Sequence, residues 1–222
     1  MENTSVLSLE NNKAQIFGEV AEDKIETYQS NGDVFYELKI NVSRLSGAID
    51  KIPVTIPKSL MESEKVDFKH GDKIGFSGEF RSRNFQEEGK SHLILTLFAK
   101  EILQEQNVAE KDTNKIFLSG FLCKKPAYRD TPFGRQICDI LLAVNRPSKR
   151  KSDYIPCIIW GRNAVFVKDL QVGTKINLMG RIQSRVYTKT QENGSVSEHT
   201  AYEISVNNFK IEKQSDEAKV EA

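Results

Sequence analysis

The sequence has little of the residues that build disulfide frameworks or metal centres. Its 222 residues include three cysteines and three histidines. Cys123, Cys138 and Cys157 share no metal-ligand spacing and lie in apolar, strand-like runs, so we expect reduced thiols in a hydrophobic core. The histidines stand far apart from one another. We therefore predict no metal site and no other cofactor.

Long apolar runs are also missing. None approaches the roughly 18 residues that span a bilayer. The first five residues lack the basic and apolar segments of a secretory signal. A hydrophobic content of 38% and a charged content of 28% are typical of a globular protein. We expect a cytoplasmic protein with no membrane contact.

Net charge is small, at +1, but its distribution is uneven. Residues 1–109 carry 13 Lys and Arg against 18 Asp and Glu, a balance of −5, whereas residues 110–222 carry 19 against 13, a balance of +6. A basic half alone indicates only a solvated surface. It gains meaning from the patterns below.

The sequence repeats itself at an offset of 102 residues. The matches are Asn12-Lys13 with Asn114-Lys115, Gly18 with Gly120, Gly32 with Gly134, Arg44 with Arg146, Gly71 with Gly173, Gly78 with Gly180, and Ser82-Arg83 with Ser184-Arg185. One extra residue in the second half moves Pro53 onto Pro156. We interpret the chain as one structural unit written twice.

Each half predicts three strands, a short amphipathic helix, and two strands joined as a hairpin. In the first half we expect strands over about 13–21, 33–43, 50–56, 72–84 and 92–103, with the helix near Ser59–Phe68. In the second we expect strands over about 115–124, 136–146, 154–160, 173–187 and 200–212, with the helix near Asn163–Leu170. This order is typical of the oligonucleotide/oligosaccharide-binding (OB) barrel.

The predicted fold class is therefore all-β, with two tandem five-stranded OB-fold barrels, each with a short helix between strands 3 and 4. The expected boundaries are a flexible N-terminus over 1–11, a first barrel over 12–103, a linker over 104–113, a second barrel over 114–212 and a short tail over 213–222. The linker is polar, which predicts few contacts between the two barrels.

One face of the second unit combines aromatic rings with cations. Tyr154 and Trp160 share a face of the third strand by period-two alternation. Along the fourth strand, alternation directs Ile182, Ser184 and Val186 toward the barrel interior and Arg181, Gln183, Arg185 and Tyr187 to the other side. Bases stack on rings and phosphates follow cations, so this face suits a single strand, whose bases are free to stack.

Residues Asn114–Arg146 carry the most specific pattern. Two apolar runs flank a ten-residue loop that contains Lys125, Pro126, Arg129, Thr131, Pro132 and Gly134. The series Asn-x-apolar-x-Leu-x-Gly, Pro-x-x-Arg-x-Thr-Pro-x-Gly and a strand ending near Asn-Arg resembles the bacterial single-stranded DNA-binding protein family, in a tandem two-barrel form. Ser152–Arg162 and Met179–Tyr187 are similar to further family stretches.

The resemblance implies a non-enzymatic protein that binds and protects single-stranded DNA in replication, recombination or repair. It implies base stacking on Tyr154, Trp160 and Tyr187. Phosphate contacts are predicted from the cations of the same unit, which are Arg181, Arg185, Arg129, Lys125, Arg146, Lys149, Arg150, Lys151 and Arg162. We then expect the protein to associate with the nucleoid.

The first unit departs from this pattern. Lys51, Pro57 and Glu79 stand where the second unit has Tyr154, Trp160 and Arg181, respectively. The predicted remainder of the binding face is Phe85, Arg81 and Arg83. We expect an acidic, degenerate barrel with a weakened or different site.

Partners and rival functions complete the expectations. A chain with two barrels would present four as a homodimer, and replication or recombination proteins are possible partners. An OB-fold scaffold that recruits such proteins and binds nucleic acid weakly remains an alternative. A nuclease would need clustered carboxylates, but Asp130, Asp139, Asp153 and Asp169 are scattered among the predicted elements. The sequence does not separate DNA from RNA.

Overall fold

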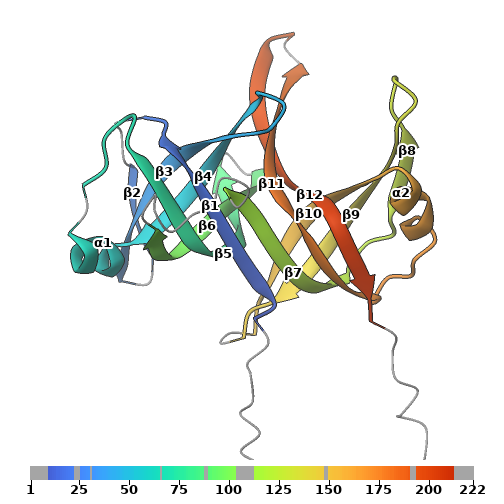
Figure 1. Ribbon diagram of the computed structural model, residues 1–222, viewed down its shortest axis with the longest axis horizontal. Helices are drawn as coiled ribbons and strands as arrows, with labels where there is room; N and C mark the ends of the chain where they lie inside the picture. Colours follow the sequence, from blue (N-terminus) through green and yellow to red (C-terminus); the bar gives the residue numbers. More distant parts are fainter. Residues whose placement is uncertain are drawn as a thin grey trace, which may run out of the picture.

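The computed structural model describes residues 10–22, 26–30, 32–65, 67–87, 90–103, 113–147, 150–190 and 194–212. The first half contains β1 (Asn12–Val20), β2 (Glu26–Ser30), β3 (Asp33–Ser43), β4 (Ile49–Pro57), α1 (Lys58–Glu64), β5 (Lys73–Glu87) and β6 (Lys90–Leu103). The second contains β7 (Asn114–Leu122), β8 (Ala127–Asp130), β9 (Gln136–Asn145), β10 (Ser152–Trp160), α2 (Arg162–Val167), β11 (Lys175–Thr190) and β12 (Val196–Ile211). Figure 1 shows this order from blue to red.

Each half closes into a five-stranded barrel, as predicted. In the first, β1 pairs with β3 and β5, and the circuit runs through β4 and β6. In the second, β7 pairs with β9 and β11, and the circuit runs through β10 and β12. Alternate residues fill each interior, such as Ile16, Ile40 and Phe76 in one barrel and Leu118 and Ile155 in the other.

Two short strands depart from the expected order. β2 pairs with β3, and β8 pairs with β9, where the sequence predicted loops. β8 lies between Pro126 and Thr131-Pro132. These flanking residues are typical of turns, so the sequence predicted a loop where the structure has a four-residue edge strand. Both helices are shorter than expected, and α1 ends at Glu64, because the next residue, Lys65, has a left-handed φ of 51°.

The glycines that recur at the repeat offset in β5 and β11 permit a β-bulge in each hairpin. The register shifts at Ser77/Gly78 in β5 and at Met179/Gly180 in β11. A Cβ at Gly78 would lie 2.0 Å from the Phe98 carbonyl oxygen, and one at Gly180 would lie 2.3 Å from that of Ser205. Only glycine fits this approach of two backbones.

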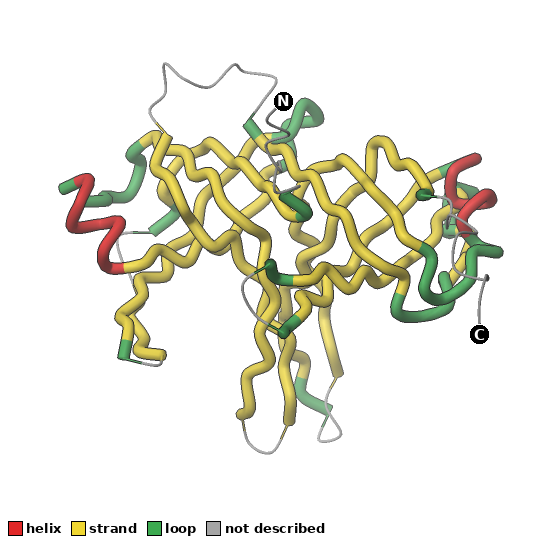
Figure 2. Tube along the Cα trace, turned by 90° about the horizontal axis from the view of Figure 1, so that it is seen from below, coloured by secondary structure: helices red, strands yellow, loops and turns green. Residues whose placement is uncertain are grey.

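The barrels join edge to edge along β1 and β7, which makes one 12-stranded sheet. In Figures 1 and 2 this junction occupies the middle of the molecule. Ala14 pairs with Ile116, its own equivalent at the repeat offset, and the flanking pairs are Asn12 with Leu118 and Ile16 with Asn114. The register is therefore that of a pseudo-twofold axis.

A buried carboxylate of the first barrel binds the second. Asp50 accepts hydrogen bonds from Arg44 Nε at 2.7 Å and from the backbone N–H of Ser184 at 2.6 Å. Arg44 also donates to the Ser184 carbonyl oxygen at 3.2 Å. The hydrogen bond to Asp50 raises the pKa of Arg44, so the guanidinium stays charged.

A buried carboxylate of the second barrel binds the first barrel in the same way. Asp153 accepts hydrogen bonds from Arg146 Nε at 2.9 Å and from the Ser82 N–H at 2.7 Å. Arg146 donates to the Ser82 carbonyl oxygen at 3.0 Å. Ser82 Oγ in turn accepts a hydrogen bond from the Tyr154 N–H at 2.8 Å. The expectation of few contacts between the barrels is wrong, because its basis was the polar linker rather than the strands on either side of it.

Two of the three cysteine side chains lie in the interior. Cys138 and Cys157 are buried, as expected, while Cys123 is partly exposed. Burial raises the pKa of Cys138 to about 11, so its thiol is a poor nucleophile at neutral pH.

Among the described residues, neither helix has the length and apolar character needed to cross a membrane.

Candidate nucleic-acid interface

The outer face of β10 continues across β12 onto β11. Ile158 pairs with Ser205, and Ser205 pairs with Arg181. Because paired residues project from the same side of a sheet, the side that carries Tyr154 and Trp160 is also the side that carries Arg181 and Tyr187. The structure therefore brings the rings of one strand and the cations of another onto one surface.

Tyr154 and Trp160 mark the two ends of this surface on β10. Their exposed fractions are 47% and 38%. The intervening Ile155 and Ile159 point inward and are buried, which fixes the backbone beneath the rings. Both rings are thus partly anchored and partly open, which is the geometry that base stacking needs.

The hairpin of β11 and β12 projects from the barrel as an arm (Figures 1 and 2). Tyr187 lies on this arm, 41% exposed, with His199 stacked beside it at 5.6 Å and the Arg185 guanidinium 5.7 Å from its ring. Val186 is 58% exposed, so its predicted interior position is wrong. Alternation indicates sides of a strand, but beyond the barrel mouth neither side faces a core.

The predicted cations differ in how free they are. Lys125, Arg150, Lys151, Arg162 and Arg185 are exposed, and Lys149 lies outside the described residues. Arg129 is ion-paired with Asp139 at 2.8 Å. Arg181 is partly buried, 3.5 Å from Asp50, and burial together with the nearby Arg44 lowers its pKa.

Arg146 takes part in the junction of the barrels. Its Nε and Nη2 donate to Asp153, and Nη2 also donates to the Ser82 carbonyl oxygen. Arg44, its repeat equivalent, is bound in the same way by Asp50. These contacts make Arg146 less available to a phosphate than the exposed cations are.

Sequence reasoning missed two exposed rings of the second barrel. His199 was treated as isolated, but the β11–β12 register places it opposite Tyr187. Phe133 is 91% exposed in the loop between β8 and β9. An apolar side chain between Pro132 and Gly134, the turn residues that keep it out of a strand, was the signal available for it.

The first barrel holds a groove that the sequence did not indicate. Three rings, Tyr28, Phe35 and Phe98, line a groove of about 430 Å³ together with Arg81 and Arg83. The expectation that only Phe85 remained as a ring on this face is wrong, because β2, which supplies Tyr28, was not predicted. The side chain of Phe85 itself lies outside the described part of the chain.

Two of the three replaced positions of the first barrel are occupied by ion-paired side chains. Lys51 pairs with Glu22 at 2.8 Å, and Glu79 pairs with Arg81 at 2.8 Å and also with Lys100. Burial acts to raise the pKa of Glu79, but hydrogen bonds from Lys100 and Arg81 outweigh it and leave the pKa lowered. Glu79 therefore remains a carboxylate at neutral pH.

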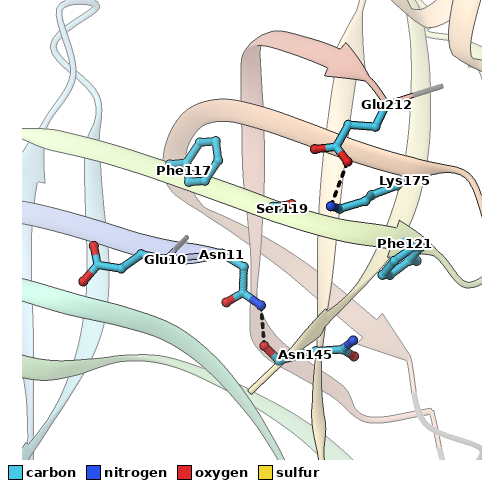
Figure 3. Close-up of a pocket in the computed structure, with 8 residues that line it drawn as sticks. All are labelled: Glu10, Asn11, Phe117, Ser119, Phe121, Asn145, Lys175 and Glu212. Carbon is cyan, nitrogen blue, oxygen red and sulfur yellow. Dashed lines mark hydrogen bonds and ion pairs between the residues drawn. The ribbon is translucent and has the colours of Figure 1, made fainter. Parts of the chain in front are cut away.

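A second pocket, of about 270 Å³, lies beside β7 (Figure 3). In Figure 3 the Asn11 side chain donates to the Asn145 carbonyl oxygen, and Lys175 pairs with Glu212 at 2.7 Å. Glu10 supplies a further carboxylate. The one lysine that lines the pocket is neutralised, so the pocket suits a nucleic-acid backbone poorly.

Metal chemistry finds no support in the same surfaces. In the regions that the structure describes, no three His, Cys, Asp or Glu side chains gather in a way that could hold a metal ion.

Comparisons with known proteins find similarity over part of the chain. Residues 113–212 match the model of the single-strand binding protein family. A single-stranded DNA-binding protein of Halalkalibacterium halodurans is 36% identical over 84 residues, which is 35% of this chain and 50% of the relative. Single-stranded DNA-binding protein A of Bacillus subtilis is 37% identical over 84 residues, 35% of this chain and 49% of the relative. The chain thus spans about half the length of these curated relatives.

The fold likeness extends over both barrels. The crystal structure of the wild-type single-stranded DNA binding protein from Thermus aquaticus superposes with a TM-score of 0.68 at 16% identity, covering 92% of this chain and 94% of that one. At this identity the likeness concerns the fold alone. The family match, for its part, concerns the second barrel: residues 113–212, which carry the surface of rings and cations, are similar to the single-strand binding protein family.

Proposed function

We propose that this protein binds and protects single-stranded DNA during replication, recombination or repair, through the second barrel. The observation that carries the proposal is the shared face of β10, β12 and β11, on which Tyr154, Trp160 and Tyr187 are exposed beside Arg185. The relatives of this barrel carry the name of single-stranded DNA-binding proteins.

In the proposed mechanism, successive bases stack on the three rings while their phosphates meet the exposed cations. A duplex cannot do this, because its bases are already stacked and paired. Arg185 serves both purposes, since its guanidinium lies near the Tyr187 ring and is open to solvent. Lys125, Arg150, Lys151 and Arg162 extend the positive track around the barrel.

The proposal needs no bond to be broken. Two acids of the second barrel are committed elsewhere, since Asp153 is bound by Arg146 and Asp139 by Arg129. A metal-dependent nuclease would need such carboxylates free and close together. The binding protein is the function that these contacts favour.

Fluorescence of Trp160, the one tryptophan of the chain, tests the proposal. We expect oligo-dT to quench its emission and a hairpin duplex to leave it unchanged, and a parallel titration with oligo-U compares DNA with RNA. Emission that stays constant at saturating oligo-dT would contradict stacking on Trp160.

Substitution of Trp160 or Tyr187 by alanine should weaken binding by roughly 1–3 kcal/mol each, the usual contribution of one stacked base. Phe166→Ala is the matched control, because this ring is 60% exposed on α2 and is not part of the proposed surface. Equal losses at Phe166 and at the two proposed positions would contradict the assignment.

We also propose that two chains assemble as a homodimer with four barrels. Phe117 and Phe121 of β7 line the outer pocket, and Met179, paired with Phe117, is exposed beside them. These side chains offer an apolar contact area on the outside of the barrel. Light scattering should give twice the chain mass of 25.2 kDa, and a monomer at micromolar concentration would contradict the dimer.

A further inference from the structure

We propose that the first barrel carries a second single-strand site, the ring groove of Tyr28, Phe35 and Phe98, and that two arginines of the chain occupy its rings until a base displaces them. The class of ligand rests on the proposed function of the second barrel. The location and the closed state rest on the contacts of the first.

The rings form a continuous stacking surface. Tyr28 and Phe35 stack at 5.2 Å between centroids with 23° between their planes, and Phe98 lies 5.9 Å from Phe35. All three line the same groove and are partly exposed. Rings gathered at a groove rather than in the core suit nucleobases, since every base presents a π face.

Two guanidinium groups cover these rings. Arg81 lies 3.8 Å from the Phe98 centroid, and Arg83 lies 4.7 Å from that of Tyr28. This is the stacking that arginine shares with bases. Phe98 and Tyr28 are therefore each contacted by a group of the chain that a base would have to replace.

Glutamates hold the arginines in place. Glu37 pairs with Arg83 at 2.9 Å, and Glu79 pairs with Arg81. The Arg83 arrangement is incomplete, since its Nε is buried with no hydrogen-bond partner among the described residues. An unsatisfied buried donor costs free energy, so Arg83 is the easier of the two to displace.

The groove lies where a nucleic-acid strand bound to the second barrel would continue. Arg146 and Lys151 of that barrel also line it, and so does Ser82. Ser82 Oγ accepts the hydrogen bond of the Tyr154 N–H at 2.8 Å. A single strand that leaves the Tyr154 ring toward the junction would therefore meet Lys151 and then the groove.

When a base displaces an arginine from its ring, the groove can bind a single strand by base stacking and phosphate contacts. A base takes the place of the Arg83 guanidinium on Tyr28, and the freed guanidinium can pair with a phosphate. Glu37 competes with that phosphate for Arg83. Glu37 is therefore a brake on the site, and its removal should tighten binding.

The test uses the full chain with Tyr154→Ala and Tyr187→Ala, which removes two of the three proposed rings of the second barrel and so weakens its binding. Labelled oligo-dT of about 30 nucleotides is read by fluorescence anisotropy. Glu37→Gln in this background should bind about two- to fivefold more tightly, the range that release of a half-exposed ion pair supports. Phe98→Ala should bind about tenfold more weakly through the loss of one stacked base.

Glu62→Gln is the matched control. It removes the same charge and the same kind of ion pair, with Lys58 at 3.3 Å, but it does not line the groove. Tighter binding by Glu37→Gln than by Glu62→Gln supports the proposal, and misfolding cannot produce such a gain. Equal affinity of the two variants overturns it, whatever Phe98→Ala does.

The same measurements separate this inference from the proposed function. Quenching of Trp160 in the wild-type chain reports the second barrel alone. If oligo-dT quenches Trp160 while Glu37→Gln and Glu62→Gln bind equally, the first-barrel site is refuted and the proposed function stands. If Trp160 is unaffected while Glu37→Gln alone tightens binding, the first barrel is the site and the proposed function fails.

Discussion

The two barrels carry different side chains at matching positions of the same sheet face. The second presents Tyr154, Trp160 and Arg181, where the first has Lys51, Pro57 and Glu79. By contrast, the residues of the junction recur in both, as Arg44 and Arg146 show. The internal repeat therefore records the packing of two barrels against each other more faithfully than it records a binding site.

Asn12 and Asn114 make the same point within each barrel. The Asn12 side chain donates to the Phe80 carbonyl oxygen at 2.8 Å and accepts from the Phe80 N–H at 2.9 Å. Asn114 does the same with Ile182 at 2.8 and 2.9 Å. These asparagines satisfy the backbone beside each bulge, which is why both copies retain them.

Separation of the barrels is the sharpest way to break the comparison. A fragment that begins at Thr113 exposes the unpaired edge of β7 and loses the Asp50 acceptor for Ser184. Because the β1–β7 register is pseudo-twofold, β7 can pair with a second copy of itself. We expect the fragment to form a dimer in light scattering. A stable monomeric fragment would mean that the junction contributes little.

The largest substitution effect should come from the junction carboxylates. Asp153→Ala leaves the buried Arg146 guanidinium and the Ser82 N–H without their acceptor. Loss of one partner of a buried ion pair costs about 3–5 kcal/mol, and we expect a lower free energy of unfolding in urea denaturation by about that amount.

Asp50→Ala should cost a similar amount, because its contacts mirror those of Asp153. Asp169→Ala, at an exposed position after α2, is the control and should change stability by less than about 0.5 kcal/mol. A loss at Asp153 no larger than at Asp169 would contradict the reciprocal junction.

The smallest expected effect distinguishes an exposed cation of the second barrel's arm, Arg185, from an ion-paired one on β8, Arg129. Arg185→Ala should make the log–log salt dependence of oligo-dT affinity shallower by about 0.7, the value for one phosphate on a single strand. Arg129→Ala should change this slope less than Arg185→Ala does, because Asp139 already neutralises that guanidinium. Affinity that falls at Arg185 with an unchanged slope would make this residue structural.

Much of the architecture could be predicted because each of its signals is local. Period-two alternation placed Ile182 inside and Tyr187 outside, and the structure agrees at both positions. The prediction for Val186 was wrong because β11 continues past the barrel. The strands β2 and β8 were not predicted because a short edge strand takes its stability from its partner strand. Tyr28 was missed with β2, and with it the ring groove.

By itself the sequence determined two OB barrels, the repeat that relates them, and the rings of β10 and β11, since strand periodicity and glycine positions are properties of a few neighbouring residues. The tertiary structure alone decided what the cations do. Arg146 and Arg185 have the same chemistry in the sequence, but one is buried against a carboxylate of the junction and the other projects from an arm into solvent. That difference depends on residues distant along the chain, such as Ser82 of the other barrel, and only the packing of the two barrels brings that carbonyl oxygen to the Arg146 guanidinium.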